Sequence, residues 1–169
     1  MQVRAATVED ARAIETIRVH GWRVAYRNVF PPEELDALPI DETRWSRRIA
    51  EPPDGWGIFV ADDDYNVIGF ACTGPSRDER GVGELYAIYV EPSSWSTGAG
   101  RALIERAEHE LAERYDQATL WVLDHNPRAR GFYERAGWTS DGGRKAEERL
   151  GVRAPEVRYR KRLSRSRSC

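Results

Sequence analysis

Three small residues near the middle of the chain, Gly98, Ala99 and Gly100, lie between a strand-like run and a helix-like run. Without bulky side chains, their backbone N–H groups can approach an anion closely. A helix that begins here would also expose unpaired N–H donors and a partial positive charge, to which Arg101 adds a full charge. The spacing predicts a pyrophosphate site, although these residues alone are equally typical of a tight turn.

Two common nucleotide-binding motifs do not match this turn. A P-loop requires Gly-Lys-Ser or Gly-Lys-Thr after its spaced glycine, and the chain contains neither. A dinucleotide-binding fingerprint requires Gly or Ala three residues after Gly100, where the chain has Leu103. The residues downstream must therefore decide between a phosphate site and a plain turn.

Tyr133 and Glu84 are ionisable residues beside apolar positions of a predicted helix and a predicted strand. By its spacing, Tyr133 falls at the edge of the apolar stripe of a short helix. The simpler explanation is that its ring packs at the edge of the core. Glu84 begins the run ELYAIYV, where period two places it on one face with Tyr86 and Ile88. The simpler explanation is that Glu84 is an exposed residue at the start of a strand. A β-bulge in this strand would change which residues share a face.

The elements that would position these residues alternate between helix and strand. A first helix is expected from Asp10 to the break at Pro31, and Asn126 and Gly137 mark the two ends of a short later helix. Further helices are expected at 33–38, 42–49 and 99–115, and strands at 3–5, 57–61, 67–73, 84–90, 118–123 and 157–163. This order predicts a mixed α/β domain with an antiparallel meander in its middle.

Composition narrows the class of protein. A chain of 169 residues suits one compact domain, and the formal net charge of −2 gives no general attraction to nucleic acid. Cys72 and Cys169 lack metal-type spacing, so neither a metal site nor a disulfide framework is expected. With no secretory signal and no membrane-spanning run, we predict a cytoplasmic protein. The basic run RYRKRLSRSRS is better explained as a solvated strand and tail than as a nucleic-acid contact.

Two signatures in the chain resemble those of the GNAT family of N-acetyltransferases. The segment from Val90 to Gly100 is similar to the family's acetyl-CoA pyrophosphate motif, except that Trp95 stands where glutamine or arginine is usual. The run NPRARGFYERAGW has the spacing of the second signature, and VRAATVEDARAI looks like the family's opening strand and helix. The resemblance covers about residues 3–163.

This resemblance implies a fold and a domain boundary. One GNAT domain would occupy residues 1–163, with residues 164–169 as a tail. Its central sheet would be mostly antiparallel and twisted, flanked by helices, and splayed between the strand that ends at Val90 and the strand at 118–123.

The resemblance also implies a reaction, the transfer of an acetyl group from acetyl-CoA to a primary amine without a metal. Tyr133 would act as general acid and Glu84, possibly through water, as general base, with His125 as an alternative base. The acetyl-CoA contacts would come from Ile88, Val90, Ser96, Thr97, Gly98, Ala99, Gly100, Arg101, Asn126 and Tyr133.

Further predictions concern the acceptor and the assembly. Trp22, Tyr26 and Phe30 would border the acceptor pocket, although a hydrophobic core face explains them as well. The acceptor would be an amine of a small molecule, a peptide or a protein, with no nucleic acid and no membrane, and the protein would be a monomer or a homodimer. The alternative function is a non-catalytic sensor that binds acyl-CoA.

Overall fold

The structure, a computed structural model, describes residues 1–64 and 66–164, so residues 165–169 of the predicted tail lie outside the described residues. Fourteen elements follow one another along the chain. They are β1 (Gln2–Ala5), η1 (Val8–Asp10), α1 (Ala11–Ala25), α2 (Pro32–Asp36), α3 (Thr43–Ala50), β2 (Gly57–Asp62), β3 (Val67–Pro75), β4 (Gly83–Val90), η2 (Pro92–Ser94), α4 (Ala99–Ala112), β5 (Gln117–Leu123), α5 (Pro127–Arg135), β6 (Thr139–Arg149) and β7 (Val152–Arg162).

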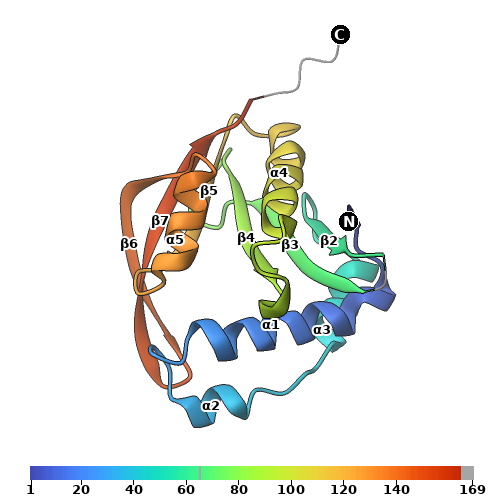
Figure 1. Ribbon diagram of the computed structural model, residues 1–169. Coiled ribbons are helices and arrows are strands. Elements are labelled where there is room, and N and C mark those ends of the chain that lie inside the picture. Colours follow the sequence, from blue (N-terminus) through green and yellow to red (C-terminus); the bar gives the residue numbers. More distant parts are fainter. Residues whose placement is uncertain (65, 165–169) are drawn as a thin grey trace.

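One seven-stranded sheet runs through the molecule in the order β1-β2-β3-β4-β5-β7-β6, and only the β4–β5 pair is parallel (Figure 1). On one face, α4 and α5 pack through Leu103, Leu111 and Tyr133. On the other face, α1 and α3 pack through residues such as Ile14 and Trp45. The predicted mixed α/β fold with an antiparallel meander is confirmed.

The first helix ends earlier than the sequence predicts. It was expected to continue to Pro31, yet α1 ends at Ala25 and Tyr26 leaves the helical conformation with φ −117°. The backbone N–H groups of Val29 and Phe30 both bond to the Tyr26 carbonyl, which folds the chain back. This turn stacks Phe30 on Trp22, with the ring centroids 5.7 Å apart.

The C-terminal hairpin is longer than expected. We predicted one or two strands after the last helix and located one at 157–163, whereas β6 and β7 are each 11 residues long and join through Leu150 and Gly151, both with positive φ. Two successive positive φ values are typical of a hairpin turn whose twist matches its strands. β6 is a polar edge strand with two glycines, so it lacks the apolar alternation that identifies a strand.

Two basic residues of β7 are paired with nearby carboxylates. Arg158 and Arg160 both contact Asp141 and Glu79, at distances of 2.6–3.0 Å. These pairs neutralise part of the charge that makes the run appear basic in the sequence. Among the described residues, no helix combines the length and the apolar character needed to cross a membrane.

A β-bulge interrupts the pairing of β3 with β4. Cys72 is opposite Ala87 and Thr73 is opposite Leu85, so Tyr86 is the extra residue. Ile88 consequently packs in the α4 core with Leu85, whereas Tyr86 packs in the α1 core. The prediction that strict period two places Tyr86 and Ile88 on one face is therefore wrong, because the bulge reverses the alternation.

β4 and β5 pair only at their beginnings. Gly83 lies opposite Ala118 and Glu84 opposite Thr119, and no further residues of these two strands are in register. β4 nevertheless continues to Val90 and β5 to Leu123, so the two strands diverge toward the helix α1 (Figure 1). The predicted splay of the sheet is confirmed.

The close packing of β3 against α4 gives a stability prediction. A Cβ atom added at Gly69 would lie 2.9 Å from both Leu103 Cδ1 and the carbonyl oxygen of Tyr89. Because the backbone oxygen cannot move aside cheaply, Gly69→Ala should lower the free energy of unfolding by about 1–3 kcal/mol. Urea unfolding followed by circular dichroism measures this change.

A second glycine serves as the control. Gly131 lies inside α5, where an added Cβ would meet only the flexible Arg135 side chain at 3.2 Å. Gly131→Ala should raise the free energy of unfolding by about 0.5–1 kcal/mol, the usual helix-propensity difference. Equal effects of the two substitutions would contradict the packing at Gly69.

Candidate functional site

A cavity of about 660 Å³ lies where β4 and β5 diverge. The gap in the sheet lets one cavity reach both helix layers. Its walls on one side come from the loop before α4 and from α5, and on the other from the end of α1 and the β6–β7 hairpin. Such a passage can hold two molecules that meet inside the sheet.

The glycine turn lines this cavity and has the geometry of an anion site. Gly98 is the N-cap residue of α4, with φ +96°, a conformation that favours glycine. A Cβ atom added at Gly100 would lie 3.3 Å from the ring of Phe132, so glycine keeps this wall open. Because α4 is 14 residues long, its unpaired first-turn N–H groups and its dipole favour an anion here.

Two predicted loop residues lie off the wall. Ala99 is buried in the α4 core at 1% exposure, and the Thr97 hydroxyl donates to the carbonyl of Ser94 at 2.7 Å. Ser96 and Arg101 do line the cavity. The structure thus brings together most of the predicted phosphate contacts.

Trp95 makes two contacts that define its place in the structure. Its indole N–H donates to the carbonyl of Val90 at 2.9 Å, at the end of β4. Its ring lies 3.3 Å from the guanidinium of Arg128, which belongs to α5. The residue therefore connects the phosphate loop to the helix on the other side of the splay, a contact that the sequence alone did not indicate.

Three arginines give this end of the cavity a positive charge: Arg101, Arg128 and Arg135. Arg101 is paired with Glu105 at 2.8 Å. Within the described part of the chain, no ion pair joins Arg128 to a carboxylate, so its charge is available to a bound phosphate. Arg128 was missed because nothing in its sequence spacing distinguishes it from a solvated helix residue.

The edge of β4 that faces the splay supplies backbone groups. Ile88 and Val90 line the cavity, and neither is in register with a residue of β5. Free N–H and C=O groups along such an edge can pair with the amides of an extended ligand, as one strand pairs with another. The arrangement fits the predicted backbone contacts of both residues, with the Val90 carbonyl already accepting a hydrogen bond from the Trp95 indole.

Asn126 marks the start of α5 beside this edge. Its side-chain oxygen accepts a hydrogen bond from the Ala129 N–H at 3.1 Å, which is the predicted cap. It also lines the cavity, as does the exposed His125 before it.

Tyr133 is more deeply buried than a core-edge position would be. Its side chain is 8% exposed, packs in the α4 core and lines the cavity. Burial raises the pKa of its hydroxyl, and the neighbouring Tyr89 raises it further. The phenol is thus in its proton-donating form at neutral pH.

Glu84 lies at the apex of the splay but not on the cavity wall. It is fully buried, and Arg77 binds both of its oxygens through backbone N–H (2.9 Å) and guanidinium (2.5 and 3.1 Å) contacts. Arg77, not Glu84, lines the cavity. In this arrangement the carboxylate has no direct contact with a molecule in the cavity.

The three predicted aromatic residues form one cluster, but only Tyr26 lines the cavity. Trp22 and Phe30 stack on each other, and Tyr26 meets both rings edge-on at 5.2 and 5.9 Å. Trp22 also donates to the Tyr89 hydroxyl at 2.9 Å. Trp22 and Phe30 therefore support the wall from behind.

A charged group on the hairpin completes the wall and was missed in the sequence. Lys145 and Arg149 of β6 and Glu156 of β7 all line the cavity. Glu156 alternates with Arg158 and Arg160 along β7, yet only the pairing of three strands shows that Glu156 is 4% exposed. No sequence signal separated it from the solvated charges nearby.

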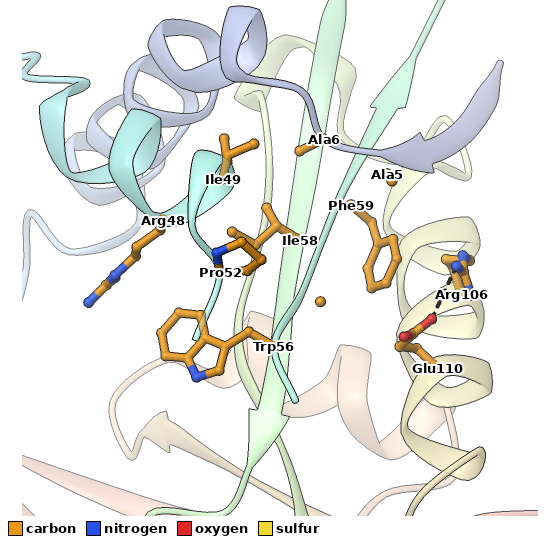
Figure 2. Close-up of a pocket in the computed structure, with 11 residues that line it drawn as sticks. Ala5, Ala6, Arg48, Ile49, Pro52, Trp56, Ile58, Phe59, Arg106 and Glu110 are labelled. Carbon is orange, nitrogen blue, oxygen red and sulfur yellow. Dashed lines mark ion pairs between the residues drawn. The ribbon is translucent and has the colours of Figure 1, made fainter. Parts of the chain in front are cut away.

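A second, smaller hollow of about 280 Å³ lies between β2, α3 and α4 (Figure 2). Two of its charged residues, Arg106 and Glu110, pair with each other at 3.1 Å, and the Arg106 guanidinium covers the ring of Phe59. The third, Arg48, stacks on Trp56 with its guanidinium 4.9 Å from the ring centroid. Among the described residues, no cluster of three or more His, Cys, Asp or Glu could hold a metal ion.

Comparison with known proteins gives a consistent result. The family model for the acetyltransferase (GNAT) family matches residues 17–138. YuaI of Bacillus subtilis, an uncharacterised N-acetyltransferase, is 37% identical over 131 residues, which cover 74% of this chain and 73% of YuaI. A mycothiol acetyltransferase of Thermomonospora curvata is 37% identical over 79% of this chain but only 46% of its own length.

A solved structure has the same fold at low sequence identity. The PaiA N-acetyltransferase of Thermoplasma acidophilum, determined in complex with coenzyme A, superposes with a TM-score of 0.75 at 18% identity. The alignment covers 96% of this chain and 98% of PaiA.

The free charge of Arg128 gives a binding prediction. Arg128→Ala should raise the Kd for acetyl-CoA by about 10-fold or more, because a charge-assisted contact to phosphate is lost. Isothermal titration calorimetry measures the Kd, and higher ionic strength should narrow the difference. Arg114→Ala removes the same charge away from the cavity and should leave the Kd unchanged. An equal rise in Kd for this variant would mean that the net charge of the protein, not Arg128 itself, sets the affinity.

Proposed function

Because the chain belongs to the GNAT family of acetyltransferases, we propose that its amine acceptor attacks acetyl-CoA directly inside the splay of the sheet. The protein is an acetyl-CoA-dependent N-acetyltransferase, and acetyl-CoA serves as its co-substrate. We further assign the transfer to a primary amine, with Tyr133 as the proton donor to the leaving sulfur.

The observation that carries this proposal is the single cavity that opens to both faces of the sheet. The phosphate-binding turn and Arg128 lie at the α4–α5 end, and Tyr26 and Glu156 lie at the end formed by α1 and the hairpin. Acetyl-CoA would enter from the first end and the acceptor from the second. The two reacting groups would meet beside Tyr133 without a covalent enzyme intermediate.

In the proposed step the amine nitrogen attacks the thioester carbonyl carbon and the carbon–sulfur bond breaks. The sulfur leaves with the bonding electrons and takes a proton from Tyr133, while the acylated nitrogen releases a proton to solvent and Tyr133 regains one from solvent. The nitrogen must first lose a proton, which for an amine with a pKa near 10.4 costs roughly 4–5 kcal/mol at pH 7. A carboxylate or a desolvated cavity can offset that cost.

The base role predicted for Glu84 stays a prediction. Its carboxylate is sealed behind Arg77, so a proton could reach it only through a water molecule that passes the guanidinium. Glu84 also neutralises Arg77 at the point where the strands separate, and this role alone explains its burial.

No cysteine among the described residues lines this cavity to support an acyl-enzyme route. Cys72 is buried at 2% exposure and does not line the cavity. Burial raises the pKa of its thiol to about 12, so the thiolate needed for attack is scarce at neutral pH. Direct transfer is therefore the simpler mechanism.

The chemical class of the acceptor must be inferred from the residues that line the cavity of this chain. The name of one relative specifies mycothiol and that of YuaI specifies no acceptor, and the mycothiol relative is covered over less than half its length. On the acceptor side the cavity is lined by Tyr26, Val29, Trp121 and Leu123. Rings and aliphatic groups favour an amine that carries an apolar or aromatic part.

An acceptor screen tests the function. Acetyl-CoA would be incubated with phenethylamine, tyramine, spermidine, L-lysine, glucosamine and an N-terminal alanine peptide, and free thiol would be measured. We expect amine-dependent thiol release and an acetylated product by mass spectrometry. Tight acetyl-CoA binding without turnover of any amine would instead favour a sensor of acyl-CoA.

Replacement of the proposed acid gives a specific prediction. Tyr133→Phe should lower kcat by about 10²- to 10⁴-fold, the usual contribution of general acid catalysis, and change the acetyl-CoA Kd little. Steady-state kinetics and calorimetry on the same preparation measure both values.

Tyr159→Phe is the matched control. Tyr159 lies beside Tyr133, with ring centroids 6.4 Å apart, but its hydroxyl donates to Glu134 and does not line the cavity. Loss of the Tyr159 hydroxyl should lower the free energy of unfolding and leave kcat unchanged. If Tyr133→Phe retains wild-type kcat, Tyr133 is not the acid.

A further inference from the structure

One buried carboxylate on the cavity wall lacks a hydrogen-bond partner. Glu156 is 4% exposed and lines the cavity, yet its Oε2 accepts no hydrogen bond from any described residue. A buried carboxylate in this state is costly unless a ligand, an ion or water donates to it.

The neighbouring cations are already engaged by a different carboxylate. Lys145 Nζ lies 2.8 Å from Glu147 Oε1, and Arg149 Nη2 lies 2.9 Å from Glu147 Oε2. The same two nitrogens are 3.6 and 3.3 Å from the oxygens of Glu156. Glu147 thus takes the short contacts, and Glu156, which lines the cavity, keeps acceptor capacity at its buried Oε2.

The strand register places Glu156 at the acceptor end. It lies opposite Leu123 of β5 and Lys145 of β6. Its neighbour two residues earlier, Ala154, packs with the Trp22–Phe30 cluster, whereas Val157 packs in the α4 core. By the alternation of a strand, the Glu156 side chain is on the face of α1 and Tyr26, opposite the phosphate-binding turn.

We propose that Glu156 binds the ammonium group of the acceptor before transfer. An ammonium has three donors and a charge that a carboxylate pairs with strongly, so it satisfies Oε2 better than a hydroxyl can. The apolar wall beside it would hold the rest of the acceptor. The substrate class is then a primary ammonium compound with an apolar or aromatic part, and this assignment rests on the proposed acetyl transfer.

The two cations favour the opposite kind of ligand, which makes the proposal testable. If Lys145 and Arg149 governed recognition, the acceptor end would prefer an anion to a cation. Three probes share one apolar part and differ in the end group: phenethylamine, 2-phenylethanol and 3-phenylpropionate. Their Kd values would be measured by NMR titration of the protein saturated with coenzyme A.

For the wild-type protein we expect phenethylamine to bind about 10- to 100-fold more tightly than 2-phenylethanol, and 3-phenylpropionate to bind least. Glu156→Gln keeps the size of the side chain and removes its charge, so the preference for the amine should fall to near unity. Glu156→Asp keeps the charge and should retain part of the preference.

Glu147→Gln is the control in the same charge cluster. Glu147 contacts the same Lys145 and Arg149, but its side chain is 45% exposed and it does not line the cavity. It should leave the preference for the amine unchanged. Equal losses in the two variants would show that the cluster, not Glu156, sets the preference.

Two results would overturn the proposal outright. One is a wild-type protein that binds phenethylamine no more tightly than 2-phenylethanol, and the other is a Glu156→Gln variant with the wild-type preference. The acetyl-CoA Kd, measured in parallel, separates this outcome from failure of the proposed function. If the wild-type protein binds acetyl-CoA but shows no preference for the amine, only the role of Glu156 is rejected. If the wild-type protein does not bind acetyl-CoA, the proposed transferase function is rejected.

Discussion

β4 and β5 are hydrogen-bonded at only two residue pairs before they separate. A continuous pair of strands would close the sheet and leave the two helix layers without a passage between them. The separation instead exposes the backbone edge of β4 and opens a cavity to both faces. The turn at Gly98–Gly100, Tyr133 and Tyr26 all line the cavity that this gap opens.

Two buried carboxylates along that gap differ in how their oxygens are hydrogen-bonded. At the apex, Glu84 is closed off, because Arg77 occupies both of its oxygens. At the open end, Glu156 is 4% exposed, but its Oε2 accepts no hydrogen bond from the described residues. Buried carboxylates with satisfied partners stabilise an arrangement, whereas one with spare acceptor capacity beside a cavity is suited to a ligand.

Local signals predicted the elements that they encode directly. The Asn126 cap and the Gly137 stop delimit α5 in the structure, and the apolar repeat through Leu103, Ala107 and Leu111 faces the core as expected. The bulge at Tyr86 was not predictable, because it arises from pairing with β3 and not from the residue itself. Nor was the burial of Glu156, since it requires three strands in register.

Trp95 shows how a departure from a motif can move a function to another element. At a position where the GNAT motif usually has glutamine or arginine, an indole anchors the end of β4 and stacks on Arg128. The cation that would serve the phosphates then comes from α5, the helix that also carries Tyr133. A phosphate bound by Arg128 would fix the same helix that positions the proton donor. Binding of the far end of acetyl-CoA and placement of the acid at its thioester would thus depend on one rigid element.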